Sequence, residues 1–246
     1  MSTSESLISH LIELRTRLLR IFAAIVLVFL CLAPWARDLY TILAHPLLAH
    51  LPKGGSMIAT EVTTPFLVPM KIAIMAAFLV TLPHTLYQLW AFIAPGLYSH
   101  EKKLVAPLIV GSTVLFFSGM AFAYFLVFPI VFGFISKVTP QGVSMMTDIG
   151  KYLDFVLTLF LAFGITFEVP IIVIILVRMG LIEVKKLKEW RPYMIVSAFV
   201  LGALFTPPDI VSQTMLAVPL WFLYELGIFL AGFVPKEAPI EKENHG

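Results

Sequence analysis

The sequence predicts an all-α protein that crosses a lipid bilayer several times. Apolar residues make up 59% of the chain and charged residues 13%, and the mean hydropathy is +0.95. A soluble domain has about 45–50% apolar and about 25% charged residues, so this chain has too little charge to cover the surface of a globule. The apolar residues also come in blocks, and several blocks reach the ~20 residues that a helix needs to span the hydrocarbon core.

Six apolar runs separated by polar gaps indicate a polytopic membrane protein with six transmembrane helices in a single integral membrane domain, residues 1–246. The predicted spans are 18–36, 66–93, 105–134, 152–177, 193–206 and 213–234. The last two are predicted to be short, and the fifth falls well below the ~30 Å of a hydrocarbon core. A reentrant hairpin over residues 193–234 is the alternative for this part. The polar residues 235–246 are predicted to form a flexible cytoplasmic tail.

The distribution of basic residues predicts the orientation, because loops on the cytoplasmic side of a membrane are enriched in Lys and Arg. With six spans, both termini fall on the side that carries most of the basic residues: Arg15, Arg17, Arg20, Lys102, Lys103, Arg178, Lys185, Lys186, Lys188, Arg191, Lys236 and Lys242. The other side carries Arg37, Lys53, Lys71, Lys137 and Lys151. Both termini are therefore predicted to be cytoplasmic. On the outer side, residues 35–51 fit either a surface helix or a connecting helix packed on the spans.

Sequence motifs argue against an enzyme. The chain has no HExxH, GxSxG, Walker A or CxxC motif, and its histidines are scattered. We therefore expect no catalytic residue, no metal site and no cofactor.

Glu168 is the most unusual residue, because it lies inside the fourth predicted span. An acidic side chain near the centre of a bilayer costs on the order of 2.5–3.5 kcal/mol on insertion scales. Pro170 has no N–H, so the carbonyl of Thr166 loses its helical partner beside this carboxyl. A polar docking point or a proton-linked site is the favoured interpretation, and a hydrogen bond between helices of this chain is the alternative.

Two further acids, Glu13 and Glu101, are predicted at the inner membrane surface. Acids on an otherwise basic face could receive a cationic peptide. Pairing with Arg15, Arg17 or Lys102 is the simpler interpretation of their spacing. Asp209 follows two prolines and fits the N-cap of the sixth helix.

Several stretches of the chain together resemble the TatC family, the multispanning core subunits of bacterial twin-arginine protein translocases. The resemblance covers roughly Leu7 to Phe233, and the order and spacing of its motifs make it specific. The motifs are His10-Leu-Ile-Glu-Leu-Arg15, Tyr87-Gln-Leu-Trp-Ala-Phe-Ile-Ala-Pro-Gly-Leu-Tyr98, His100-Glu101, Phe163-Gly-Ile-Thr-Phe-Glu-Val-Pro170 and Thr206-Pro-Pro-Asp209 through Ser212-Gln213.

This resemblance implies a function and a place. It implies a core receptor in the bacterial inner membrane, driven by the proton-motive force, that binds the twin-arginine signal peptides of folded proteins. It implies as partners the single-span subunits TatA and TatB, other TatC copies and the lipid bilayer, with no nucleic acid. On the matching motifs, Glu13 and Glu101, with His10 and Arg15, are assigned to the cytoplasmic signal-peptide site. Glu168 is assigned to a polar intramembrane site for partner helices, together with Thr206, Asp209 and Gln213.

Two other function classes remain open from the residues alone. A secondary transporter for a small solute would use Glu168 as a proton-coupled site, but such folds usually show repeated halves, and the chain shows no repeat. A membrane-embedded enzyme lacks a recognisable nucleophile, base or metal constellation. Reconstituted uptake and activity-based labelling, respectively, would test them.

Overall fold

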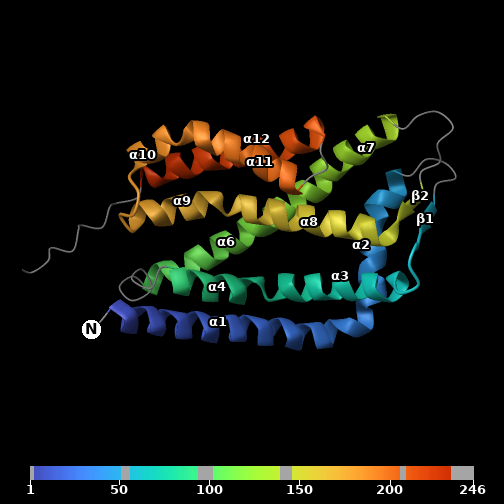
Figure 1. Ribbon diagram of the computed structural model, residues 1–246, viewed down its shortest axis with the longest axis horizontal. Coiled ribbons are helices and arrows are strands. Elements are labelled where there is room, and N and C mark those ends of the chain that lie inside the picture. Colours follow the sequence, from blue (N-terminus) through green and yellow to red (C-terminus); the bar gives the residue numbers. More distant parts are fainter. Residues whose placement is uncertain (1–2, 51–55, 94–101, 139–145, 206–208, 234–246) are drawn as a thin grey trace, which may run out of the picture.

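Long helices running back and forth along one direction make up the protein (Figure 1). The computed structural model describes residues 3–50, 56–93, 102–138, 146–205 and 209–233. The main helices are α1 (Thr3–Leu32), α3 (Thr64–Val80), α4 (Leu82–Ile93), α6 (Lys102–Phe122), α7 (Phe128–Val138), α8 (Ile149–Phe167), α9 (Val169–Arg178), α11 (Arg191–Phe205) and α12 (Ile210–Ala231). Most of them run along the long direction, and α6 and α7 cross the others diagonally (Figure 1). A π-helical turn, η2 (Ala123–Val127), joins α6 to α7.

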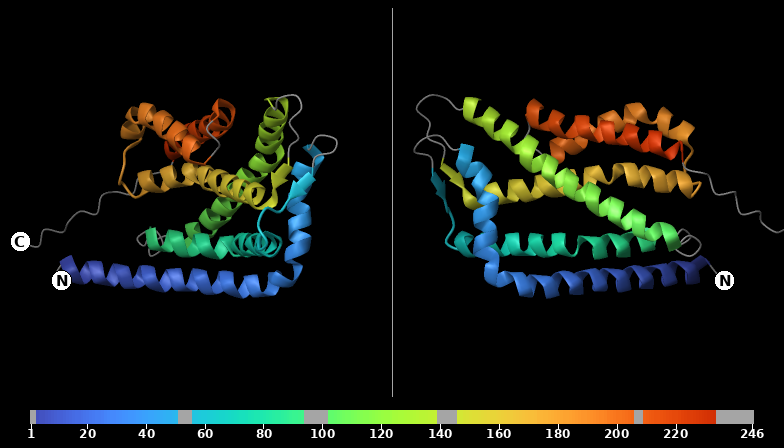
Figure 2. Two further views of the ribbon diagram at one scale, coloured as in Figure 1. Left: turned by 45° about the vertical axis from the view of Figure 1, so that its right-hand side comes forward. Right: turned by 180° about the vertical axis from the view of Figure 1, so that it is seen from behind.

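The two ends of this bundle differ. One end holds the first residues of α1 and α6, the short helix α10 (Val184–Glu189) and the last residues of α12 (Figures 1 and 2). We call it the basic end, because α1 and α10 bring there Arg15, Arg17, Lys185, Lys186 and Lys188. The other end, which we call the strand end, holds η1 (Ala33–Trp35), α2 (Ala36–His50), β1 (Ser56–Ile58) and β2 (Met146–Asp148).

The membrane-spanning elements agree with the predicted apolar runs, except in number and in one length. Four continuous helical segments are long and apolar enough to cross a bilayer: Ile8–Leu43, Ala106–Phe134, Ile149–Arg178 and Ile210–Ala231. The pair α3 and α4 qualifies as a fifth if it counts as one bent span. The structure therefore gives four or five candidate spans by length and composition, and α11 is an apolar helix too short for that count, so the number six is not confirmed.

The last two helices are not both short. With 15 residues, α11 extends about 22 Å, below the ~30 Å of a hydrocarbon core. In contrast, α12 has 22 residues and extends about 33 Å. The prediction for α12 is wrong because the helix begins directly after its cap, Asp209, and continues through Pro219.

Breaks inside two spans follow from prolines that the sequence shows. The axes of α3 and α4 meet at 60°, just before Pro83, whose missing N–H removes a helical hydrogen bond. The hydroxyl of Thr81 donates to the carbonyls of Ala77 and Phe78 at this break. A second break separates α8 from α9 at Glu168, two residues before Pro170.

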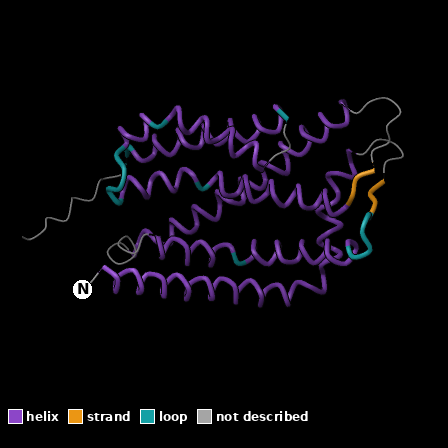
Figure 3. Tube along the Cα trace, in the orientation of Figure 1, coloured by secondary structure: helices purple, strands orange, loops and turns teal. Residues whose placement is uncertain are grey.

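A small parallel sheet is the one departure from the all-α prediction among the described residues (Figure 3). Ser56, Met57 and Ile58 of β1 pair with Met146, Thr147 and Asp148 of β2. Strands of three residues are too short to show an alternating pattern, so hydropathy alone does not predict them. Asp148 also accepts hydrogen bonds from the N–H and hydroxyl of Thr60, which ties the two loops together at the strand end.

The surface segment α2 combines the two predicted roles. Leu39 and Leu43 pack against buried residues of the spans. Ile42 of α2 and Trp35 of the preceding η1 are instead exposed. The helix turns sharply away from α1 and lies across the strand end (Figure 2).

Candidate functional site

The first candidate site is an ion pair between α1 and α4 near the basic end. Arg17 Nε and Nη2 both donate to Glu13 Oε1, at 2.9 and 2.6 Å. Arg17 Nη1 also donates to Gln88 Oε1 on α4 at 3.2 Å. Of the alternatives for Glu13, the structure thus shows pairing with Arg17, one helical turn away. The Glu13 side chain nevertheless stays 39% exposed. Its second oxygen, Oε2, forms no hydrogen bond with any residue that the structure describes.

The other residues assigned to this site differ in their surroundings. The ring of His10 stacks on Phe92 of α4, with the ring centroids 4.3 Å apart. Arg15 is exposed, on a different face of α1 from Arg17. Glu101, the second predicted acid, lies outside the described residues, so its place in the same site as Glu13 stays a prediction.

Helix α4 presents two faces to two different surroundings. Gln88 and Phe92, one turn apart, meet Arg17 and His10 of α1. Leu89 and Trp90 instead line a groove on the other side. The same two turns of α4 therefore contribute to both candidate sites.

The second candidate site is this groove, which has a volume of about 470 Å³ and contains Glu168. Its walls come from the end of α3, from α4, from α6 and from the α8–α9 junction: Phe78, Leu82, Thr85, Leu86, Leu89, Trp90, Ile93, Phe116, Ile165, Ile172, Ile175 and Leu176. The lining is almost wholly apolar. Volumes of about 300–1,000 Å³ are typical of ligand pockets.

Glu168 is buried in this groove without a partner. Its side chain is 6% exposed, and neither carboxyl oxygen forms a hydrogen bond with a described residue. The hydroxyl of Ser112 lies close by. Its oxygen accepts from Trp90 Nε1 at 3.0 Å, and its own O–H forms no hydrogen bond with an acceptor among the described residues. The Thr85 hydroxyl in the same groove is also buried, without a hydrogen-bond partner among the described residues. Unpaired buried polar groups cost free energy, so a ligand group that pairs with them gains that free energy on binding.

The remaining residues predicted for the intramembrane site lie at the start of α12. Asp209 caps this helix, because its Oδ1 accepts from the N–H of Ser212 at 2.7 Å. This confirms the predicted N-cap. The backbone of Gln213 lies against Gly202 of α11, where a Cβ on residue 202 would meet the Gln213 carbonyl at 3.2 Å. Thr206 lies outside the described residues. Neither Asp209 nor Gln213 lines the groove that holds Glu168.

Three polar contacts hold distant parts of the chain together, and the sequence does not predict them. Lys71 of α3 pairs with Asp154 of α8 at 2.6 Å. Arg191 pairs with Glu225 of α12 at 2.6 Å. The hydroxyl of Tyr224 donates to the carbonyl of Leu187 at 2.8 Å. Each joins residues more than 30 positions apart, and no spacing rule connects such positions.

The apolar spans define a multi-pass helical membrane protein, and one of its apolar grooves contains a buried carboxyl. Its family follows from comparison with known proteins. A family model described as Sec-independent protein translocase protein (TatC) matches residues 9–219. The chain belongs to this family of membrane protein-transport components.

Individual relatives and a solved structure agree with this assignment. The chain is 55% identical over 223 residues to the Sec-independent protein translocase protein TatC of Azotobacter chroococcum mcd 1, covering 91% of this chain and 88% of the relative. It is 50% identical over 230 residues to the protein of the same name from Escherichia coli strain K12, covering 94% and 89%. A crystal structure of the twin arginine translocase receptor TatC superposes with a TM-score of 0.80 at 39% identity, covering 91% of this chain and 98% of that one.

Proposed function

We propose that this protein is the core receptor of a twin-arginine translocase, and that its basic end binds the signal peptides of folded proteins. The observation that carries the proposal is the half-exposed carboxylate of Glu13, at the basic end of a chain in this family. The resemblance assigns the receptor role to Glu13 and Glu101, with His10 and Arg15 beside them. No part of this role calls for catalysis, a metal or a cofactor.

The geometry of Glu13 supports binding of a second arginine, supplied by the signal peptide, beside Arg17. Arg17 occupies only Oε1, and Oε2 is open among the described residues. An incoming guanidinium could therefore bind Oε2 while Arg17 stays in place. Arginine suits such a site better than lysine, because its planar guanidinium carries five N–H donors, so one can bind Oε2 while others reach neighbouring acceptors. Each exposed pair contributes only about 0–1 kcal/mol, so recognition requires both acids and apolar contact as well.

The groove around Glu168 is proposed to dock a helix of TatA or TatB. A polar side chain of the partner helix would pair with the Glu168 carboxyl, and apolar side chains would cover the surrounding wall. Thr206, Asp209 and Gln213 are proposed to serve partner docking at the start of α12, a separate surface. Other TatC copies and the proton-motive force complete the proposed transport system.

The orientation proposed is that of an inner-membrane protein with both termini in the cytoplasm. It is supported by the position of α1's start and α12's end, which lie together at the basic end (Figure 1). Lys and Arg favour the cytoplasmic side. The six-span topology is supported by the antiparallel course of α11 and α12, with α11 crossing as a short helix.

A crosslinking experiment tests the receptor role. Membranes carrying wild type, Glu13→Ala, Glu101→Ala or the double variant are incubated with a photo-reactive twin-arginine signal peptide, and a twin-lysine peptide serves as the control. We expect each single variant to lose up to about fivefold in binding, and the double variant to approach the level of the twin-lysine control. Equal crosslinking of the double variant and wild type would show that these acids do not form the site.

A further inference from the structure

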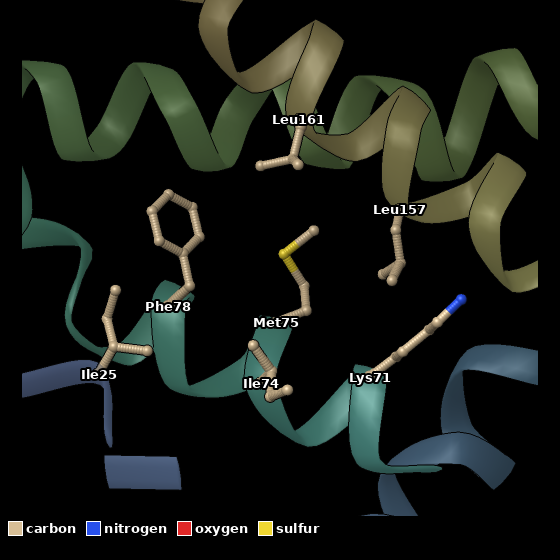
Figure 4. A pocket seen from close by; sticks show the side chains of 7 residues that line it. All are labelled: Ile25, Lys71, Ile74, Met75, Phe78, Leu157 and Leu161. Carbon is tan, nitrogen blue, oxygen red and sulfur yellow. The ribbon is translucent and has the colours of Figure 1, made fainter. Parts of the chain in front are cut away.

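A second groove, unrelated to Glu168, lies between α1, α3 and α8. It has a volume of about 440 Å³ and is lined by Ile25, Lys71, Ile74, Met75, Phe78, Leu157 and Leu161. Figure 4 shows Met75 and Phe78 of α3 facing Leu157 and Leu161 of α8 across an open space, with Lys71 at one end. Apart from that lysine, the lining is entirely apolar.

Towards the strand end, this apolar groove gives way to a polar hollow. The hollow has a volume of about 110 Å³, and Lys71 lines both spaces. Its other polar side chains come from the loop before α3 and from the first turns of α8: Thr60, Glu61, Thr64, Asp148, Lys151 and Asp154. On α8, residues 151, 154, 157 and 161 follow helical spacing, so one face changes from charged to apolar along its length.

Two of the charges in the hollow are available to a ligand. Lys71 and Asp154 pair with each other at 2.6 Å, and Asp148 accepts hydrogen bonds from Thr60, Gly150 and Lys151. Lys151 and Glu61 are both exposed, and neither forms an ion pair with another described residue. The hollow thus offers one free cation and one free carboxylate to the same occupant.

The change from apolar to polar along the groove indicates the kind of occupant. A flexible acyl chain matches the apolar part, and a charged headgroup matches the polar hollow at its end. An amphiphile with both parts in one molecule therefore fits the whole length.

We propose that the α1–α3–α8 groove binds one zwitterionic phospholipid with a primary ammonium in its headgroup, of the phosphoethanolamine type. One acyl chain lies between α3 and α8. The phosphate accepts from Lys151, whereas Lys71 stays paired with Asp154, and the ammonium donates to Glu61. Basic and polar pockets at the ends of spans are a usual place for lipid headgroups.

The test measures lipid retention by the purified full-length protein. Delipidated protein is titrated with defined phospholipids in detergent, and bound lipid is counted by native mass spectrometry. We expect phosphatidylethanolamine to be retained in one copy, about two- to fivefold better than phosphatidylglycerol or phosphatidylcholine. Phosphatidylglycerol lacks the ammonium, and the quaternary ammonium of phosphatidylcholine has no N–H to donate.

Two sets of variants test the headgroup contacts and the acyl-chain contacts separately. Lys151→Gln and Glu61→Gln should each reduce this preference about two- to fivefold, while Lys185→Gln at the basic end removes a charge and should leave it unchanged. Leu157→Trp or Ile74→Trp fills the groove from either wall and should abolish retention of the single copy. Val114→Trp adds the same indole on an exposed face of α6 and should not.

Three results would overturn the proposal. The first is equal retention of all phospholipids by wild type, which would indicate surrounding lipid only. The second is unchanged retention when both tryptophan variants fold. The third is a photo-reactive group at Leu161 that crosslinks, in membranes, to a protein rather than to lipid. None of these readouts involves a signal peptide, so this test and that of the receptor role can fail independently.

Discussion

Arg17 of α1 and Gln88 of α4 are joined by a hydrogen bond of 3.2 Å, although 71 positions separate them in the sequence. Gln88 is buried, with 3% of its surface exposed, and its carbonyl oxygen holds the guanidinium that also binds Glu13. This contact fastens the first span to the second close to the proposed receptor site.

A double-mutant cycle on Arg17→Ala and Gln88→Ala should measure how much this hydrogen bond stabilises the packing of α1 on α4. A hydrogen bond to a charged group that is partly buried should give a coupling free energy of about 1 kcal/mol. The measurement is the free energy of unfolding of the four proteins in detergent. Additive effects of the two substitutions, within about 0.3 kcal/mol, would show that the bond does not stabilise the fold.

Glu168 should be replaceable by an amide but not by a methyl group. Glu168→Gln keeps hydrogen-bonding capacity in the groove, so we expect export of a folded twin-arginine reporter to be largely retained. Glu168→Ala removes that capacity and should reduce the export rate strongly. Ser118→Ala, which removes a polar side chain from an exposed position of α6 outside the groove, is the matched control and should export normally. Wild-type export by Glu168→Ala would remove the case for a docking role.

Gly119 of α6 should not tolerate a side chain. A Cβ there would clash with the carbonyl oxygen of Phe163 on α8, so Gly119→Ala must push α6 and α8 apart. We expect a loss of about 1–3 kcal/mol in the free energy of unfolding.

The matched control for this substitution is Gly133→Ala in α7, where a Cβ would meet nothing within 4 Å. It should stabilise the protein by up to about 1 kcal/mol, because Ala is the better helix former. Thermal unfolding of both variants in detergent checks the pair. Equal effects at the two positions would contradict the close approach of α6 and α8.

Acid should destabilise the fold at the strand end, because Asp148 becomes protonated there. Hydrogen bonds from Thr60, then from the backbone of Lys151, lower the pKa of this carboxyl from 3.8 to about 2. Because the folded pKa is the lower one, the stabilisation is present above pH ~4 and is lost as the pH falls towards 2. Wild type should therefore lose more Tm than Asp148→Asn between pH 5 and pH 2. Parallel losses would mean that other carboxylates dominate.

The spans were predictable because membrane insertion depends on local hydropathy, which a single sequence shows directly. Pro83 and Pro170 likewise marked both breaks, since a missing N–H acts on its own helix. The sequence could not show that α1 starts at Thr3, well before its apolar part, because hydropathy detects the membrane and not the helix.

The candidate sites were predictable only in part. Glu168 was recognisable because a buried acid is costly wherever its partners lie, and Glu13 was recognisable beside Arg17 through helical spacing. The contacts of Arg17 with Gln88, of Trp90 with Ser112 and of Lys71 with Asp154 depend on how distant helices pack. Neither composition nor periodicity contains that information.

The two faces of α4 carry a thermodynamic consequence. Gln88 and Phe92 on one face contact α1 at the proposed signal-peptide site, and Leu89 and Trp90 on the other line the groove proposed for a partner helix. A ligand that rotates or shifts this helix at one site changes the shape of the other. Linkage then requires reciprocity: by whatever factor a bound signal peptide alters the affinity for a partner helix, that partner alters the affinity for the signal peptide.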